Sequence, residues 1–111
     1  MDIITNGRRS AADRTTPGKT NWQPYQSGKG IYVDIDTSSG RFAGIPVYTA
    51  SIGGISRHWA TLGVNAIYNA SATKFRVYIR WADGSPLTPE TANELQWHIN
   101  WVGTEIPAKG Y

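Results

Sequence analysis

The sequence contains no cysteine, which excludes disulfide bonds and thiolate metal sites. It has only two histidines, and neither His58 nor His98 stands at a metal-ligand spacing from an acidic residue. We therefore expect neither a metal ion nor a cofactor. The sequence also lacks a nucleophile elbow, a phosphate-binding loop and a zinc-protease helix, so we expect that the protein is not an enzyme.

Long apolar runs are absent as well. Residues 1–9 contain no apolar stretch of signal-peptide length, and no later segment approaches the roughly 20 apolar residues of a membrane-spanning helix. We expect no membrane insertion, and a location that is either cytoplasmic or released and virion-associated. A chain of 111 residues has room for one hydrophobic core, so we expect one folded domain.

Neither sign of charge is in large excess, because 11 basic residues stand against 8 acidic ones, for a net charge of +3. A nucleic-acid-binding protein needs a clustered basic footprint. Lys74, Arg76 and Arg80 form a short basic stripe with Tyr78 among them, a pattern that a single-strand binder could use. A solvated strand face accounts for the same stripe, and we expect no nucleic-acid partner.

Aromatic residues are abundant: the chain has five tryptophans and six tyrosines. Such an excess indicates either a large contribution to the core or flat apolar faces that are offered to ligands.

The clearest structural signal is the alternation of apolar and polar residues over residues 73–84. The apolar positions are Phe75, Val77, Ile79 and Trp81. Because side chains alternate faces along a strand, this pattern predicts a central antiparallel strand with one buried face. Residues 95–102 repeat the device with Trp97, Ile99 and Trp101, and we expect this run to pair with the central strand.

Three further strands are predicted over residues 30–37, 46–52 and 63–69, and Thr88 followed by Pro89 predicts one helical turn. Residues 1–29 have no period and are expected to form an irregular N-terminal lead. The domain proper is then residues 30–105, and residues 106–111 form a tail. Short strands separated by turns, without a long helix, predict an all-β sandwich or small barrel.

Two short segments place an aromatic ring beside hydrogen-bonding groups: Arg57-His58-Trp59, and Trp81 with Asp83. A sugar ring has an apolar C–H face that tryptophan can cover, and hydroxyl groups that charged or amide side chains can bind. The alternative is that both tryptophans are core residues and the polar side chains are only solvated.

The order of these elements resembles the H-type lectin family, best known from snail agglutinins. The resemblance rests on Ile45-Pro46-Val47-Tyr48, on Tyr68, on the run from Phe75 to Trp81, and on His98-Ile99-Asn100-Trp101-Val102. It implies a six-stranded antiparallel β-sandwich that assembles as a trimer. It also implies sites near the protomer boundaries for N-acetylgalactosamine or related sugars. Where that family has a Trp-His pair at the end of the central strand, this chain has Ala82 and Asp83 after Trp81.

The resemblance thus implies an oligomeric, carbohydrate-binding lectin that recognises terminal galactose-like or N-acetylgalactosamine-like sugars on glycans, as in cell adhesion. Aromatic contact is assigned to Trp81 or Trp59, and hydroxyl binding to Asp83, with Arg57 and His58 contributing from a neighbouring loop. The alternative is a structural or receptor-binding β-module of a larger assembly, such as a phage tail fibre.

Overall fold

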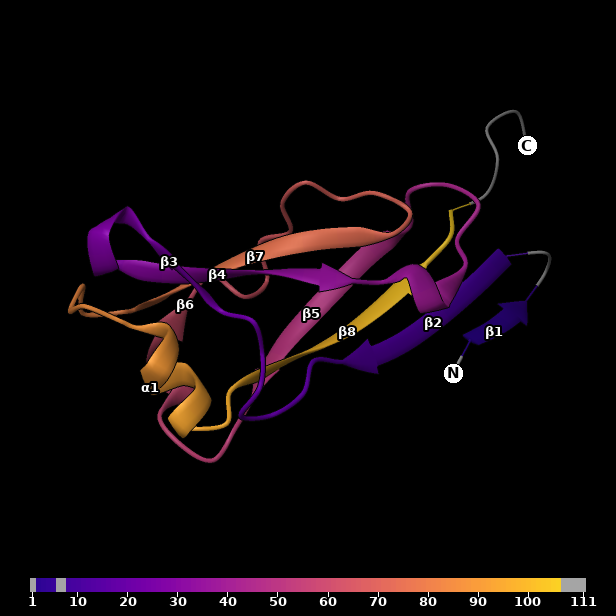
Figure 1. Ribbon diagram of the computed structural model, residues 1–111. Coiled ribbons are helices and arrows are strands. Elements are labelled where there is room, and N and C mark those ends of the chain that lie inside the picture. Colours follow the sequence, from indigo (N-terminus) through magenta and orange to yellow (C-terminus); the bar gives the residue numbers. More distant parts are fainter. Residues whose placement is uncertain (1, 6–7, 107–111) are drawn as a thin grey trace.

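The computed structural model describes residues 2–5 and 8–106, which form two four-stranded antiparallel sheets and one short helix (Figure 1). Sheet I contains, in spatial order, β1 (Asp2–Thr5), β2 (Arg8–Arg14), β8 (His98–Thr104) and β5 (Val47–Gly53). Sheet II contains β3 (Gln23–Tyr25), β4 (Gly30–Asp36), β7 (Lys74–Trp81) and β6 (Thr61–Leu62). The helix is α1 (Pro89–Glu94), and three 3-10 turns are η1 (Gln26–Gly28), η2 (Ser38–Gly40) and η3 (His58–Ala60). The predicted all-β class is confirmed.

The centre of sheet II follows from the alternation in the sequence. On β7 the residues Phe75, Val77 and Ile79 are fully buried, and their neighbours face outward. In the antiparallel register with β4, Ile35 lies opposite Phe75 and Ile31 lies opposite Ile79. Because both strands present β-branched or aromatic side chains to the same face, the pair forms one wall of the core.

The prediction that the last strand pairs with β7 is wrong. β8 lies in sheet I between β2 and β5, and β7 is flanked by β4 and β6. The apolar faces of β7 and β8 meet across the core instead, where Tyr48 of β5 lies 4.6 Å from Phe75 and 6.2 Å from Trp101, measured between ring centroids. Alternation shows which face of a strand is buried, but it does not show which strand lies beside it.

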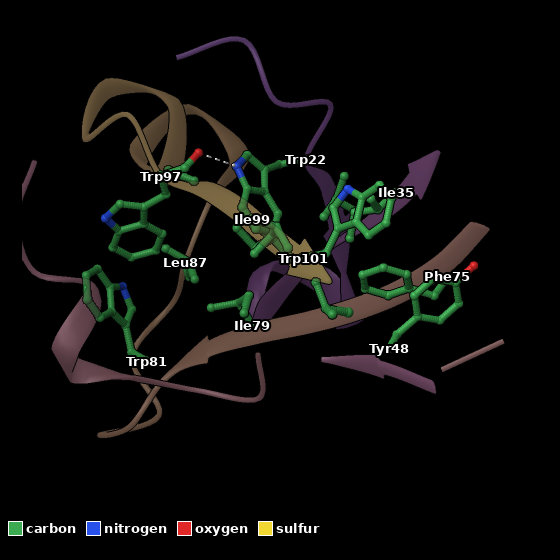
Figure 2. Packing of buried hydrophobic residues seen from close by; sticks show 14 of the residues in the cluster. Trp22, Ile35, Tyr48, Phe75, Ile79, Trp81, Leu87, Trp97, Ile99 and Trp101 are labelled. Atoms are coloured by element: carbon green, nitrogen blue, oxygen red, sulfur yellow. Dashed lines mark hydrogen bonds between the residues drawn. The ribbon is translucent and has the colours of Figure 1, made fainter. Parts of the chain in front are cut away.

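The core between the sheets has two ends (Figure 2). Tyr48 and Phe75 lie at one end, and Trp81, Leu87 and Trp97 gather at the other. At the second end α1 closes the core, with Thr88 as its N-cap: the Thr88 Oγ1 accepts a hydrogen bond from the Thr91 N–H at 3.2 Å. The predicted helical turn after Thr88 is therefore confirmed.

Residues 1–29 do not form the irregular lead that we expected, because β1, β2 and β3 lie within this segment. β2 pairs with β8 over residues 10–14, from Ser10 opposite Thr104 to Arg14 opposite Asn100. Its sequence shows no period because only Ala11 is buried, so the strand is fixed by backbone hydrogen bonds more than by apolar contacts. These additional strands also explain why the sheets contain more than the six strands that the resemblance implied.

The strand expected over residues 63–69 is absent. The neighbouring β6 has two residues, and within the predicted span only Tyr68 makes a bridge, to Arg76. Gly63, at φ +116°, turns the chain immediately after β6. Of the expected tail, Ile106 is exposed, and residues 107–111 lie outside the described part of the chain.

The molecule is elongated, with dimensions of 47 × 24 × 19 Å. The β1–β2 hairpin and the end of β8 lie at one end, and α1, η3 and β6 lie at the opposite end (Figure 1). Within the described residues, none of the helices has the length and apolarity needed to cross a membrane.

Candidate functional site

The structure brings together the two segments that the sequence analysis selected. Thr61 of β6 pairs with Trp81 at the end of β7, and the Ala82 N–H donates a hydrogen bond to the Ala60 carbonyl oxygen at 2.8 Å. The η3 turn therefore lies against the turn that follows β7. We call Arg57, His58, Trp59, Trp81 and Asp83 the end cluster.

Trp59 is the most exposed large apolar side chain among the described residues, with 88% of its surface accessible. It is the central residue of η3, and Arg57 precedes this turn in the left-handed conformation, at φ 70°. A non-glycine residue in that conformation is uncommon, and such strain is frequently found at functional sites. Both features make Trp59 a candidate ligand-binding residue.

Trp81 is only 7% exposed and belongs to the core, so it does not offer the open stacking face that we considered for it. Its ring contacts Trp97 edge to face, with 5.2 Å between centroids. The Arg57 guanidinium lies over the Trp81 ring, with Cζ 4.7 Å from the centroid. This cation–π contact holds the Arg57 charge at the surface beside Trp59.

Asp83 is exposed in the turn after β7. Its Oδ1 accepts hydrogen bonds from the Ser85 hydroxyl at 2.6 Å and from the Ser85 N–H at 2.9 Å. These bonds, with a smaller contribution from the Arg57 charge, lower the pKa of Asp83 below its usual value. The carboxylate is therefore ionised at neutral pH, and Oδ2 is left for a ligand hydroxyl.

His58 is half-buried beneath the turn, and its carbonyl oxygen accepts a hydrogen bond from the Thr61 hydroxyl at 2.7 Å. Its ring Nδ1 is buried and finds no hydrogen-bond partner within the described residues. The backbone of His58 therefore stabilises the turn, and its ring Nδ1 is a buried polar atom without a partner among the described residues.

The segment before the end cluster is fixed to the core on both sides. The Trp97 indole N–H donates to the Ser56 carbonyl oxygen at 2.9 Å, and the Ile55 N–H donates to the Leu95 carbonyl oxygen at the same distance. Ile55 and Leu62, which precede and follow Trp59 in the sequence, are also exposed apolar residues. The end cluster is thus an anchored, partly apolar surface with one cation and one anion.

The end cluster carries three groups that can bind a polar ligand, which are an exposed aromatic ring, a guanidinium and a carboxylate. In the portion of the chain that the structure describes, no group of three or more His, Asp or Glu side chains gathers to hold a metal ion. Asp83 is exposed and its pKa is lowered, so its carboxylate is a poor general base.

A second feature was missed by the sequence analysis. On the outer face of sheet II, Tyr25, Tyr68 and Tyr78 line a pocket of about 210 Å³, which we call the tyrosine pocket. Only Tyr78 belonged to the stripe noted in the sequence. Tyr25 and Tyr68 come from β3 and from the irregular segment before β7, and nothing in the sequence pattern shows that these segments meet.

Arg76, which the sequence placed in a basic stripe, is paired. Its Nε and one terminal nitrogen donate to the two carboxylate oxygens of Asp34 at 2.8 and 2.9 Å, and the guanidinium lies 4.1 Å from the centroid of Tyr32. This pairing removes Arg76 from the cations available to an anionic polymer.

The resemblance to H-type lectins remains a prediction, since the chain matches no protein-family model, no curated protein and no solved structure.

Proposed function

We propose that this protein is a carbohydrate-binding lectin with an H-type-lectin-like β-sandwich, and that its end cluster binds a terminal sugar. The observation that carries the proposal is the 88% exposure of Trp59 in a turn that follows the fixed Arg57 guanidinium and lies against the turn of the ionised Asp83. A large apolar ring held in water at an anchored turn costs free energy that a ligand can recover.

The chemistry of the end cluster matches that of a sugar ring. Trp59 would cover the C–H face, and the Asp83 Oδ2 would accept hydrogen bonds from ring hydroxyls. Arg57, held over Trp81, would donate to the ring oxygen or to a hydroxyl. The resemblance suggests galactose-like or N-acetylgalactosamine-like sugars, and the half-buried His58 would serve to position the turn.

Self-association, as a homotrimer by the resemblance, would be mediated by the outer face of sheet I. Here Ala12, Val102 and Thr49 lie side by side on β2, β8 and β5, and Val47 lies beside Thr104 in the next row. A shallow hollow of about 570 Å³ runs over this face. Asp13 and Arg14 also line this hollow, so the close approach of a second flat surface would centre on the neutral side chains around Val102. Several weak sugar sites on one particle would then act together through avidity.

The second candidate is a structural or receptor-binding module of a larger assembly, such as a phage tail fibre. The exposed trio of Ile55, Trp59 and Leu62 favours it, because buried tryptophans dominate the binding energy of many protein interfaces. In that case the end cluster would contact a protein and would not require a sugar.

The experiment that tests the proposal is a glycan array, after the mass in solution has been established by sedimentation. Selective binding to one class of terminal sugar, lost in Trp59→Ala and in Asp83→Asn, would support the lectin. A trimer that ignores every glycan would instead support the structural module.

A matched control for Asp83→Asn is available at the other end of sheet II. Asp36 Oδ1 accepts a hydrogen bond from the Ser38 N–H at 2.8 Å, the same turn that Asp83 makes with Ser85, and Asp36 lies outside the end cluster. Asp36→Asn should therefore leave glycan binding unchanged. Equal loss in both variants would mean that net charge, not Asp83, governs binding.

A further inference from the structure

The tyrosine pocket is a corner built from three rings. Tyr25 lies 4.8 Å from Tyr78 with the ring planes tilted by 55°, and Tyr68 lies 5.0 Å from Tyr78 with the planes nearly perpendicular at 89°. Tyr25 and Tyr68 are 40% and 50% exposed, so apolar ring surface and hydroxyl groups are both accessible. Non-parallel rings form a corner for a puckered ring, whereas a planar base would require a parallel slot.

Two glycines in the lining of the tyrosine pocket let the backbone lie close against β7. A Cβ atom on Gly63, which has φ +116°, would overlap the carbonyl oxygen of Tyr78. A Cβ atom on Gly30 would lie 2.9 Å from the carbonyl oxygen of Ile79, closer than such contacts normally are. Only glycine allows the backbone to approach β7 this closely, so the pocket depends on these two residues.

The charge around the pocket is positive and unpaired. Lys29 and Arg80 line it, and no Asp or Glu does. Neither the Lys29 ammonium nor the Arg80 guanidinium makes a hydrogen bond or ion pair with any residue in the described ranges. Further along the same face acidic residues balance the cations, because Arg76 binds Asp34 and Lys74 stands in register with Asp36. The free positive charge of this face is therefore concentrated at the tyrosine pocket.

The loop that carries one side of the rim is conformationally strained. Gln26 and Ser27 are consecutive non-glycine residues in the left-handed region, at φ 50° and 56°. The Leu87 N–H holds this loop by donating to the Gly28 carbonyl oxygen at 2.9 Å. Strain that the surrounding structure maintains is a common property of ligand-binding loops, and here it brings Gln26 and Lys29 to the rim.

We infer that the tyrosine pocket is a second binding site, separate from the end cluster, for an acidic saccharide unit. The tyrosine corner takes the C–H surface of the sugar ring, and Gln26 and the tyrosine hydroxyls bind its hydroxyls. Lys29 and Arg80 bind its anionic group, which is a carboxylate or a sulfate. A single-stranded nucleic acid fits less well, because the tilted rings offer no slot, and because the pairing of Arg76 with Asp34 interrupts the basic track that successive phosphates need.

The test is calorimetric titration with four probes at one ionic strength: a trigalacturonate, a sulfated galactose trisaccharide, the neutral galactose trisaccharide and a single-stranded oligothymidylate. Binding of the carboxylated or sulfated probe, with the neutral one much weaker, is expected and identifies the anionic group. Amide shifts in two-dimensional NMR should be confined to residues 25–30, 62–68 and 78–80. Tighter binding of the oligothymidylate, or shifts centred on the end cluster, would overturn the inference.

Matched variants separate the pocket from general electrostatics. Arg80→Gln and Lys29→Gln should each weaken binding of the acidic probe by about tenfold or more, the change expected when one charge-assisted hydrogen bond is lost. Lys74→Gln removes the same charge from the same strand, outside the pocket. An equal loss in Lys74→Gln would mean that the probe responds only to net charge, and the proposed site would be rejected.

Discussion

Trp97 and Trp59 lie close together in the fold but have opposite environments. Trp97 is 0% exposed, contacts Trp81, and donates its indole N–H to the backbone of Ser56. Trp59, three residues beyond Ser56, is 88% exposed. The buried ring therefore anchors the segment that presents the exposed one, and the exposure of Trp59 is a property of a fixed turn rather than of a loose loop.

The largest expected effect is the loss of that anchor. Trp97→Ala should lower the free energy of unfolding by about 3–5 kcal/mol, because it removes the largest fully buried side chain and leaves a cavity. Chemical denaturation measures the change. Trp97→Phe, which keeps an aromatic ring but loses the indole N–H, should cost less. A loss below about 1 kcal/mol in Trp97→Ala would contradict the central place given to this residue.

The opposite end of the core has a polar anchor that is expected to be less important. The Tyr48 hydroxyl donates to the Ser71 carbonyl oxygen at 2.6 Å and lies 2.7 Å from the Thr37 hydroxyl, and burial raises the pKa of Tyr48. Tyr48→Phe would leave these partners unsatisfied, at a cost of about 1–3 kcal/mol in the free energy of unfolding. Thermal unfolding of Tyr48→Phe and of Thr37→Val tests the network, and an unchanged midpoint in both would show that it contributes nothing.

The ion pair between Asp34 and Arg76 on the exposed face of sheet II should contribute still less to the free energy of unfolding. The hydrogen bond from Arg76 lowers the pKa of Asp34, so any stabilisation by this pair is present above the unfolded-state pKa of about 3.9 and is lost as the pH falls through the lower folded-state pKa. Because both side chains are partly exposed, its magnitude should be about 0–1 kcal/mol. A double-mutant cycle with Asp34→Asn and Arg76→Gln measures the coupling, which should be full at pH 6 and should decrease as the pH falls through the lowered pKa of Asp34. A coupling that does not change with pH, even where Asp34 is protonated, would mean that the contact is not ionic.

The smallest expected change in stability is that of Trp59→Ala, the counterpart of Trp97→Ala. Trp59→Ala should alter the free energy of unfolding by no more than about 0.5 kcal/mol, because its side chain is already in water. Denaturation of this variant beside Trp97→Ala provides the check. Destabilisation of Trp59→Ala, or a smaller particle in sedimentation, would place Trp59 in a subunit interface.

The strands with strict alternation could be predicted from the sequence because burial of one face imposes a period of two, as on β4 and β7. The strand that pairs with β8 could not be predicted, because the same alternation is expected whether β7 pairs with β8 in one sheet or packs against it across the core. β2 was missed because Ala11 alone gives it an apolar signal. In the end cluster the residue types could be selected by their chemistry, but the burial of Trp81 and the exposure of Trp59 depend on how two turns meet. The tyrosine pocket depends in the same way on segments that are distant in the sequence.

The elongated shape of the molecule decides how the end cluster is presented. β1, β2 and the last residues of β8 lie at one end, and η3 lies at the other (Figure 1). A surface or scaffold that holds the protein at the β1–β2 end would therefore be separated from the end cluster by the long dimension of the fold. Copies attached side by side in this way would all direct Trp59 outward, in one orientation, toward whatever approaches the array.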